Sequence, residues 1–157
     1  MPATLQAKAP EPETLQEVTL VIENRLSELA RVERWLAETV AAWSIPERAA
    51  FALDLVMNEA VTNVVNHAYR DTGVREIRIL LRHTDDWVEI EVSDDGEAFD
   101  PFAVPVVAAP TDLEQASIGG RGIHLIKAFT DDRDYRRVAG RNHLRLRIET
   151  SDPSGDA

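Results

Sequence analysis

Residues 54–69, DLVMNEAVTNVVNHAY, repeat their apolar side chains every three or four positions, which is the spacing of one face of an α-helix. The helix is predicted to run to about Tyr69. Its apolar face, which should pack on a sheet, consists of Leu53, Met57, Ala60, Val61, Val64 and Ala68. The opposite face carries Glu59, Asn63 and Asn66. A solvated face is one interpretation, but Asn is a poor helix former, and Glu, Lys, Arg or Gln would serve solvation better.

Strand and helix patterns alternate on both sides of this helix. Apolar alternation and short turns predict strands over residues 17–23, 75–83, 86–94, 132–139 and 142–149. Helical spacing predicts two further helices, over 25–43 and about 121–130, the first capped by Asn24. Hairpin-linked strands with helices between them indicate an α+β fold, a two-layer α/β sandwich in which helices cover one face of a mainly antiparallel mixed sheet.

Composition narrows the class of protein. The chain has 28 acidic and 17 basic residues, a formal net charge of −11, and no cysteine. The negative charge argues against general binding to nucleic acid or to an anionic membrane. The lack of cysteine excludes a disulfide framework, a thiolate zinc site and a cysteine nucleophile, and it suits a cytoplasmic location. No apolar run approaches the roughly 20 residues that cross a bilayer.

One compact domain is expected, over residues 16–150. Residues 1–15 hold three prolines and few large apolar side chains, which predicts a disordered leader. Residues 151–157 predict a short disordered tail. Inside the domain the periodicity fails from Gly96 to Gly120, and an irregular connection of this length is often a functional lid.

Two segments carry groups suited to binding phosphate or a base. Glu59 and Asn63 lie one helical turn apart, so a proton-accepting carboxylate is paired with an amide oxygen that can join the oxygen shell of Mg²⁺. Asp94-Asp95-Gly96 ends a predicted strand. Such an ending is a common acidic turn. A carboxylate there can also accept a hydrogen bond from an exocyclic amine, while Gly96 leaves room for a flat ligand.

A glycine-rich segment, SIGGRGIHLIKAF at 117–129, opens the last predicted helix. Free backbone N–H groups at a helix start attract phosphate, which is one interpretation of this segment. The alternative is that the glycines only provide a flexible hinge for the lid. Arg121 contacts either phosphate or only the surface. The segment lacks the Gly-Lys-Ser/Thr of a Walker A loop, and it follows a loop rather than the strand of a dinucleotide fingerprint.

Three ordered motifs resemble the N, G1 and G2 boxes of the GHKL (Bergerat-fold) ATPases: Glu59-xxx-Asn63 on a helix, Asp94-x-Gly96 after a strand and Gly120-x-Gly122 before a helix. That superfamily includes gyrase, MutL and the sensor histidine kinases. The segments that look most like its anti-sigma factor serine/threonine kinase branch are NEAVTNVVNHAY (58–69), DDGEAFDP (94–101) and GGRGIHLI (119–126). The resemblance covers about residues 20–149. One position departs from the broad Asp-x-Gly-x-Gly pattern, because Ala98 stands in place of the second glycine.

The resemblance implies a histidine-kinase-like ATPase fold and an ATP-binding anti-sigma factor with protein serine/threonine kinase activity. It assigns Glu59 as the general base and Asn63 as the Mg²⁺ ligand. It assigns ATP binding to Asn63, Asn66, Asp94, Gly96, Gly119, Gly120, Arg121, Gly122 and Ile123. The implied partners are a sigma factor, an anti-sigma-factor antagonist that is phosphorylated on Ser or Thr, and a second copy in a homodimer. No direct contact with nucleic acid or membrane is expected.

Three alternatives stay open from the sequence. The chain could be an ATP-binding partner switch without kinase activity, or a detached ATP-binding domain of a sensor histidine kinase. It could also be a purely structural acidic α+β domain.

Overall fold

The computed structural model describes residues 14–69, 71, 73–103 and 120–151. Of the expected leader and tail, Thr14, Leu15 and Ser151 fall within these ranges. Residues 104–119, which make up most of the expected lid, lie outside them.

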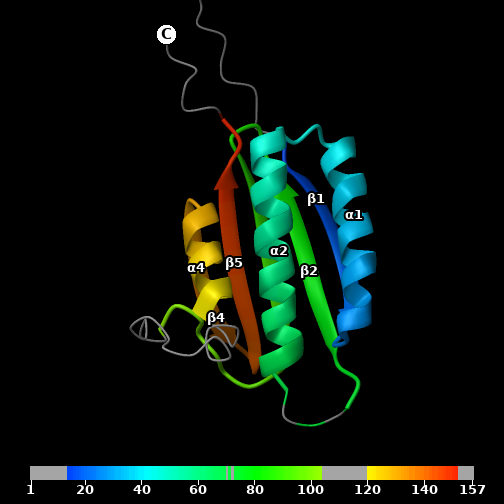
Figure 1. Ribbon diagram of the computed structural model, residues 1–157, viewed down its shortest axis with the longest axis vertical. Helices are drawn as coiled ribbons and strands as arrows, with labels where there is room; N and C mark the ends of the chain where they lie inside the picture. The colour runs from blue at the N-terminus through cyan, green and yellow to red at the C-terminus, as the bar shows by residue number, and fades with distance from the viewer. Residues whose placement is uncertain (1–13, 70, 72, 104–119, 152–157) are drawn as a thin grey trace, which may run out of the picture.

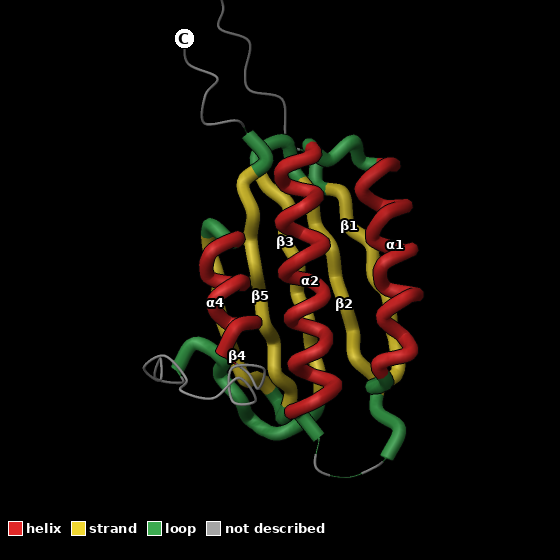
Figure 2. The backbone as a smooth tube through the Cα atoms, in the orientation of Figure 1, coloured by secondary structure: helices red, strands yellow, loops and turns green. Residues whose placement is uncertain are grey.

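Five strands form one sheet in the order β1-β2-β3-β5-β4 (Figures 1 and 2). They are β1 (Gln16–Glu23), β2 (Glu76–His83), β3 (Trp87–Asp94), β4 (Asp132–Val138) and β5 (Arg141–Glu149). All four strand pairs in the described part of the chain are antiparallel. The α+β fold and the mainly antiparallel sheet are therefore confirmed, and the parallel pair that a mixed sheet would contain does not occur among these strands.

The helices lie side by side over one face of the sheet (Figure 1). They are the short 3₁₀ helix η1 (Leu26–Glu28), α1 (Leu29–Ala42), α2 (Glu47–His67) and α4 (Gly120–Phe129). The helix predicted over 25–43 thus begins as a 3₁₀ turn. None of the helices in the described residues is long and apolar enough to span a membrane.

Asn24 does not cap that helix, so this prediction is wrong. Its side-chain Nδ2 donates to the Gly73 carbonyl at 3.2 Å, and its Oδ1 accepts the Arg75 backbone N–H at 2.8 Å. The side chain thus links the end of β1 to the segment before β2. A short polar side chain can hydrogen-bond any backbone groups within reach, and those at a helix start are only one possibility.

The predicted apolar face of α2 packs on the sheet. Leu53, Met57 and Val61 are at most 1% exposed. They share one core with inward residues of the strands, among them Ile77, Ile79, Leu81, Val88, Ile90, Val92 and Leu146. Fully burying one such side chain stabilises the fold by about 1.5–3 kcal/mol. Packing of the apolar face therefore fixes the rotation of α2 about its axis, and with it the direction of the polar face.

The opposite face of the sheet carries an ion network centred on Glu89 of β3. The Glu89 side chain is only 3% exposed. Its carboxylate lies 2.9 Å from Arg147, 3.2 Å from Arg145 and 3.5 Å from Arg82. Arg147 also stacks over the Trp87 ring at 4.0 Å. These arginine side chains cover β3 on the face without helices, which keeps the central strand buried from both sides.

Candidate functional site

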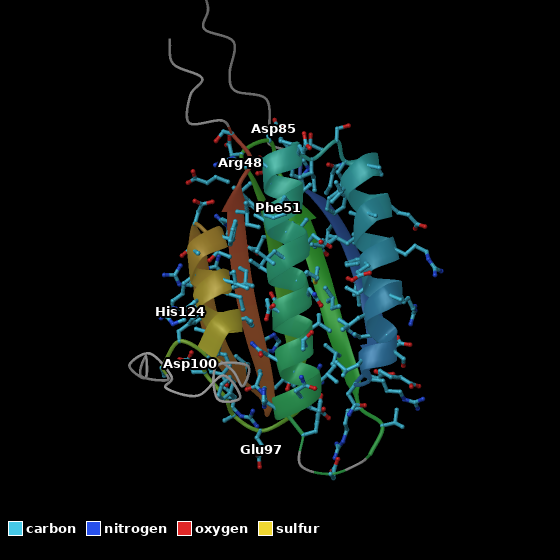
Figure 3. All side chains as sticks on the ribbon, in the orientation of Figure 1. Arg48, Phe51, Asp85, Glu97, Asp100 and His124 are labelled. Atoms are coloured by element: carbon cyan, nitrogen blue, oxygen red, sulfur yellow. The ribbon has the colours of Figure 1, made fainter. Side chains whose placement is uncertain are left out.

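The residues predicted to be functional meet at one end of the molecule. The last turn of α2, the end of β3, the start of α4 and the start of β5 all lie at the lower end of Figure 1. Glu97 and Asp100, in the loop after β3, mark the same end in Figure 3, whereas Arg48, Phe51 and Asp85 lie toward the other end.

Asp94 is a buried carboxylate at the end of β3. It is 3% exposed. Its Oδ1 accepts the Gly96 N–H at 2.9 Å and Asn142 Nδ2 at 3.0 Å. Within the described residues both hydrogen bonds reach Oδ1, so Oδ2 is the oxygen left to accept a hydrogen bond from a ligand.

Gly96 allows the segment after β3 to lie directly on the end of α2. A Cβ at this position would stand 2.4 Å from the Ala68 carbonyl oxygen and 2.7 Å from the Ala68 Cβ. The next residue, Glu97, donates its backbone N–H to the same carbonyl at 2.9 Å. A side chain at position 96 would therefore separate α2 from β3 at the point where Asp94 is held.

We expect Gly96→Ala to destabilise the domain by about 1–3 kcal/mol, because the added methyl meets backbone rather than a movable side chain. The midpoint of urea unfolding measures the loss. Gly73→Ala is the matched control, since the Cβ there meets Asp71 Oδ1 at 3.3 Å, on an exposed side chain that can move. Equal midpoints for both variants would contradict the close approach at Gly96.

A second cluster joins α2 to α4. A Cβ on Gly122 would lie 2.6 Å from Glu59 Oε2 and 3.6 Å from Asn63 Nδ2. Glu59 and Asn63 are both partly buried, so this part of the polar face of α2 is not freely solvated. A side chain at position 122 would therefore require the Glu59 carboxylate to shift.

One pocket of about 40 Å³ connects Asn63 to Asp94. A single water needs about 10–15 Å³ on this scale, so the pocket is larger than a water site. It is lined by Ala60, Asn63, Val64, His67, Ala68, Val92, Asp94, Phe99, Pro101, Ile126, Tyr135, Asn142 and Leu144. Most of these side chains are apolar, with a few polar groups among them, which is the usual character of a small-molecule site.

Tyr69 contacts Asp95, the residue that follows Asp94. Its hydroxyl lies 3.3 Å from Asp95 Oδ1 and donates to it. Burial, together with the nearby charges of Asp94 and Asp95, raises the pKa of Tyr69 well above its ordinary value. The phenol therefore stays neutral and keeps its proton for Asp95.

The structure brings together five of the ten predicted site residues, in two clusters. Glu59, Asn63 and Gly122 form one cluster, and Asp94 with Gly96 forms the other. Asn66 is exposed and does not line the pocket. Gly120 begins α4 and Ile123 is half-buried within it. Gly119 and the side chain of Arg121 lie outside the described residues.

Sequence reasoning missed Asn142 and Tyr135, both of which line the pocket. Asn142 is 5% exposed and pairs directly with Asp94 across β3 and β5. A signal was present in the alternation of β5, where Asn142 shares a face with Leu144, Leu146 and Ile148. A buried Asn on an otherwise apolar strand face points to a specific polar partner.

Comparison with known proteins identifies the family. A model described as a histidine kinase-like ATPase domain matches residues 22–148, which is most of the chain. The chain belongs to the histidine kinase-like ATPase family. Within it, the chain is 32% identical to the serine/threonine-protein kinase BtrW of Bordetella bronchiseptica over 121 residues, 77% of this chain and 78% of that protein.

Two shorter matches are to proteins named serine-protein kinase RsbW. The one from Oceanobacillus iheyensis is 38% identical, covering 51% of this ATPase and 53% of the relative. The one from Listeria innocua is 34% identical, covering 56% and 62%. The chain therefore spans a little over half the length of these two relatives.

A solved structure shares the fold. The crystal structure of the RsbU and RsbW domains of a Mycobacterium tuberculosis protein superposes with a TM-score of 0.62 at 17% identity. The match covers 88% of this chain and 33% of the solved one. The expected histidine-kinase-like ATPase fold is thereby confirmed.

Proposed function

We propose that this ATPase-family chain is an ATP-dependent protein serine/threonine kinase that also acts as an anti-sigma factor. The observation that carries the proposal is a pocket lined by both Asp94 and Asn63, with Glu59 and Gly122 close to Asn63. The Asp94 carboxylate suits the base of a nucleotide, and the Asn63 amide suits its phosphates. The names of the relatives, serine/threonine-protein kinase and serine-protein kinase, support the reaction class.

The base of the nucleotide would lie at the Asp94 end. Oδ2 of Asp94 is available to accept a hydrogen bond from the exocyclic amine of adenine. Val92, Ile126 and Leu144 supply apolar walls for the flat ring. The close contact between Gly96 and Ala68 holds Ala68, another lining residue, against the segment after β3.

The phosphates would lie between Asn63 and the start of α4. The N-terminal N–H groups of a helix attract phosphate, and Gly122 leaves space there that a side chain would fill. The described residues contain no cluster of three His, Asp or Glu side chains able to hold a metal by themselves. Mg²⁺ commonly takes one or two protein oxygens together with substrate phosphates, and the Asn63 amide oxygen fits that pattern. When bound, Mg²⁺ would neutralise the charge that develops on the phosphates.

Glu59 would be the general base. In the proposed reaction, the hydroxyl oxygen of a Ser or Thr on the partner bonds to the γ-phosphorus of ATP, and the bond from that phosphorus to the ADP oxygen breaks. The hydroxyl proton passes to the Glu59 carboxylate, leaving ADP and a phosphorylated partner. Asn63, the proposed Mg²⁺ ligand, lies one turn further along α2, so the Glu59 carboxylate would lie next to the phosphates.

The proposed partners are a sigma factor, which the chain would sequester, and an antagonist protein, which it would phosphorylate. We also propose a homodimer with β1 and α1 as the candidate interface, and a cytoplasmic location, since ATP is a cytoplasmic substrate. Asn66, Gly119, Gly120, Arg121 and Ile123 stay proposed nucleotide-binding residues. No contact with nucleic acid or membrane is proposed.

The function is tested by incubating the purified chain with Mg²⁺ and γ-labelled ATP, together with candidate antagonist proteins retained in a pull-down with and without ATP. We expect acid-stable label on Ser or Thr of one retained protein. Acid-labile label would instead indicate phosphohistidine and a sensor-kinase domain. ATP binding without any transfer would indicate a partner switch that lacks kinase activity.

Asn63→Ala tests the proposed metal ligand. Loss of the amide oxygen is expected to raise the Mg²⁺ concentration that gives half-maximal transfer by about tenfold or more. A titration of transfer rate against Mg²⁺ measures the change. Asn58→Ala is the matched control, since Asn58 is an exposed asparagine on the same helix that bonds only Thr62 within the described residues. Unchanged Mg²⁺ dependence in Asn63→Ala would exclude Asn63 as the ligand.

A further inference from the structure

Asn142 lies at the start of β5 and uses all of its hydrogen-bonding capacity. Its Nδ2 donates to Asp94 Oδ1 at 3.0 Å and to the Glu97 carbonyl at 2.7 Å. Its Oδ1 accepts from Arg137 Nη1 at 3.0 Å and from the Tyr135 hydroxyl. An amide can donate two hydrogen bonds and accept two, so this buried side chain is fully satisfied.

The donors around Asn142 fix which way its amide points. A guanidinium group only donates, so the atom of Asn142 that faces Arg137 must be the oxygen. The NH₂ group is then directed at Asp94. Oδ1 of Asp94, a residue that lines the pocket, receives two donors, from Asn142 and from the Gly96 N–H, so Oδ2 is the oxygen left to accept from a ligand.

We propose that Asn142 is the positioning residue that sets the selectivity of this site for adenine over guanine. The inference rests on the proposed ATP-binding function. Adenine presents an amino donor at the ring position where guanine presents a carbonyl acceptor. A carboxylate whose orientation is locked by Asn142 accepts from the first and repels the second. A site built around one hydrogen bond discriminates strongly when the wrong group faces it.

The same network fixes the segment after β3 before any base binds. Arg137 Nη1 donates to the Gly96 carbonyl at 3.0 Å, and the Phe99 N–H donates to the Tyr135 hydroxyl at 3.2 Å. Residues 96–99 are thus tied to the β4–β5 hairpin through Asn142 and its neighbours. Such preorganisation lowers the ordering cost of binding, which favours the base whose polarity matches.

The test is the affinity of Asn142→Ala for ATP and for GTP, measured by calorimetry with Mg²⁺ present. Without the hydrogen bond from Asn142, the Asp94 carboxylate is no longer held in one orientation and should bind the adenine amine less well. ATP affinity should then fall about tenfold. GTP gains nothing from that contact, so its affinity should change by less than about twofold. The preference for ATP should therefore shrink about tenfold. An equal loss for both nucleotides, or no loss for either, would overturn the proposal.

Two further variants keep the result interpretable. His143→Ala is the control, since its ring bonds Glu91 on the other face of the sheet at 3.0 Å, and the ATP preference should be unchanged. Arg137 is exposed, so Arg137→Met leaves the buried Asn142 in place and removes one donor to its Oδ1. This variant should reduce the preference for ATP about threefold, and it can be measured even if Asn142→Ala does not fold. Wild-type protein that binds neither nucleotide would contradict the proposed function, whereas wild-type selectivity that persists in the variants would overturn only the role of Asn142.

Discussion

Glu59→Gln is expected to abolish phosphoryl transfer, lowering its rate by about 10²- to 10⁴-fold, while ATP affinity changes little. The amide keeps the size of the side chain and its position beside Gly122, but it cannot take the proton of the attacking hydroxyl. The rate of label transfer to the partner protein, together with calorimetric ATP binding, separates the two effects.

Asp54→Asn is the matched control for Glu59→Gln. Asp54 is an exposed carboxylate on the same helix, so its neutralisation changes the net charge equally without touching the pocket. Its transfer rate should equal that of the wild type. Transfer by Glu59→Gln at near wild-type rate would show that another group takes the proton, or that no general base is needed.

Asp94→Asn is expected to weaken ATP binding roughly 10- to 150-fold, the equivalent of the 1.5–3 kcal/mol of a charge-assisted hydrogen bond. The Gly96 N–H and Asn142 Nδ2 both donate toward the side chain and would hold the new carbonyl oxygen. The new NH₂ group would then face the adenine amine, donor against donor. Calorimetry with ATP measures the loss.

The neighbouring Asp95 supplies the control. It is exposed, and its Oδ1 accepts the Tyr69 hydroxyl, so Asp95→Asn removes the same charge one residue away from the pocket. We expect a change in ATP affinity of less than about threefold, because exposed charges are screened by solvent. Equal losses in the two variants would mean that the effect is one of net charge rather than of adenine recognition.

The local part of the site could be predicted from the sequence. Glu59 and Asn63 are one helical turn apart, so a helix alone places them together, and the apolar spacing of residues 54–69 shows which face stays polar. Gly96 and Gly122 could be predicted from short motifs. A side chain would be unfavourable at the two positions for different reasons, because at Gly96 it would meet the backbone of Ala68 and at Gly122 it would meet the Glu59 carboxylate.

The non-local part could not be predicted in the same way. Asp94 and Asn142 are 48 residues apart and meet because β3 and β5 pair in a register that sets them opposite each other. A sequence pattern shows that Asn142 is out of place on an apolar strand face, but register depends on the whole sheet. The prediction that Asn24 caps a helix is wrong for a related reason. Its local sequence favours a cap, but in the fold its side chain bonds Gly73 and Arg75, which are distant in sequence.

A crystal structure with Mg²⁺ and a non-hydrolysable ATP analogue tests the central claim most directly. The account predicts the adenine amine within hydrogen-bond distance of Asp94 and the metal-bound phosphates beside Asn63, with Glu59 next to the γ-phosphate. A nucleotide bound elsewhere on the chain, or one whose phosphates lie far from Asn63 and Glu59, would contradict it.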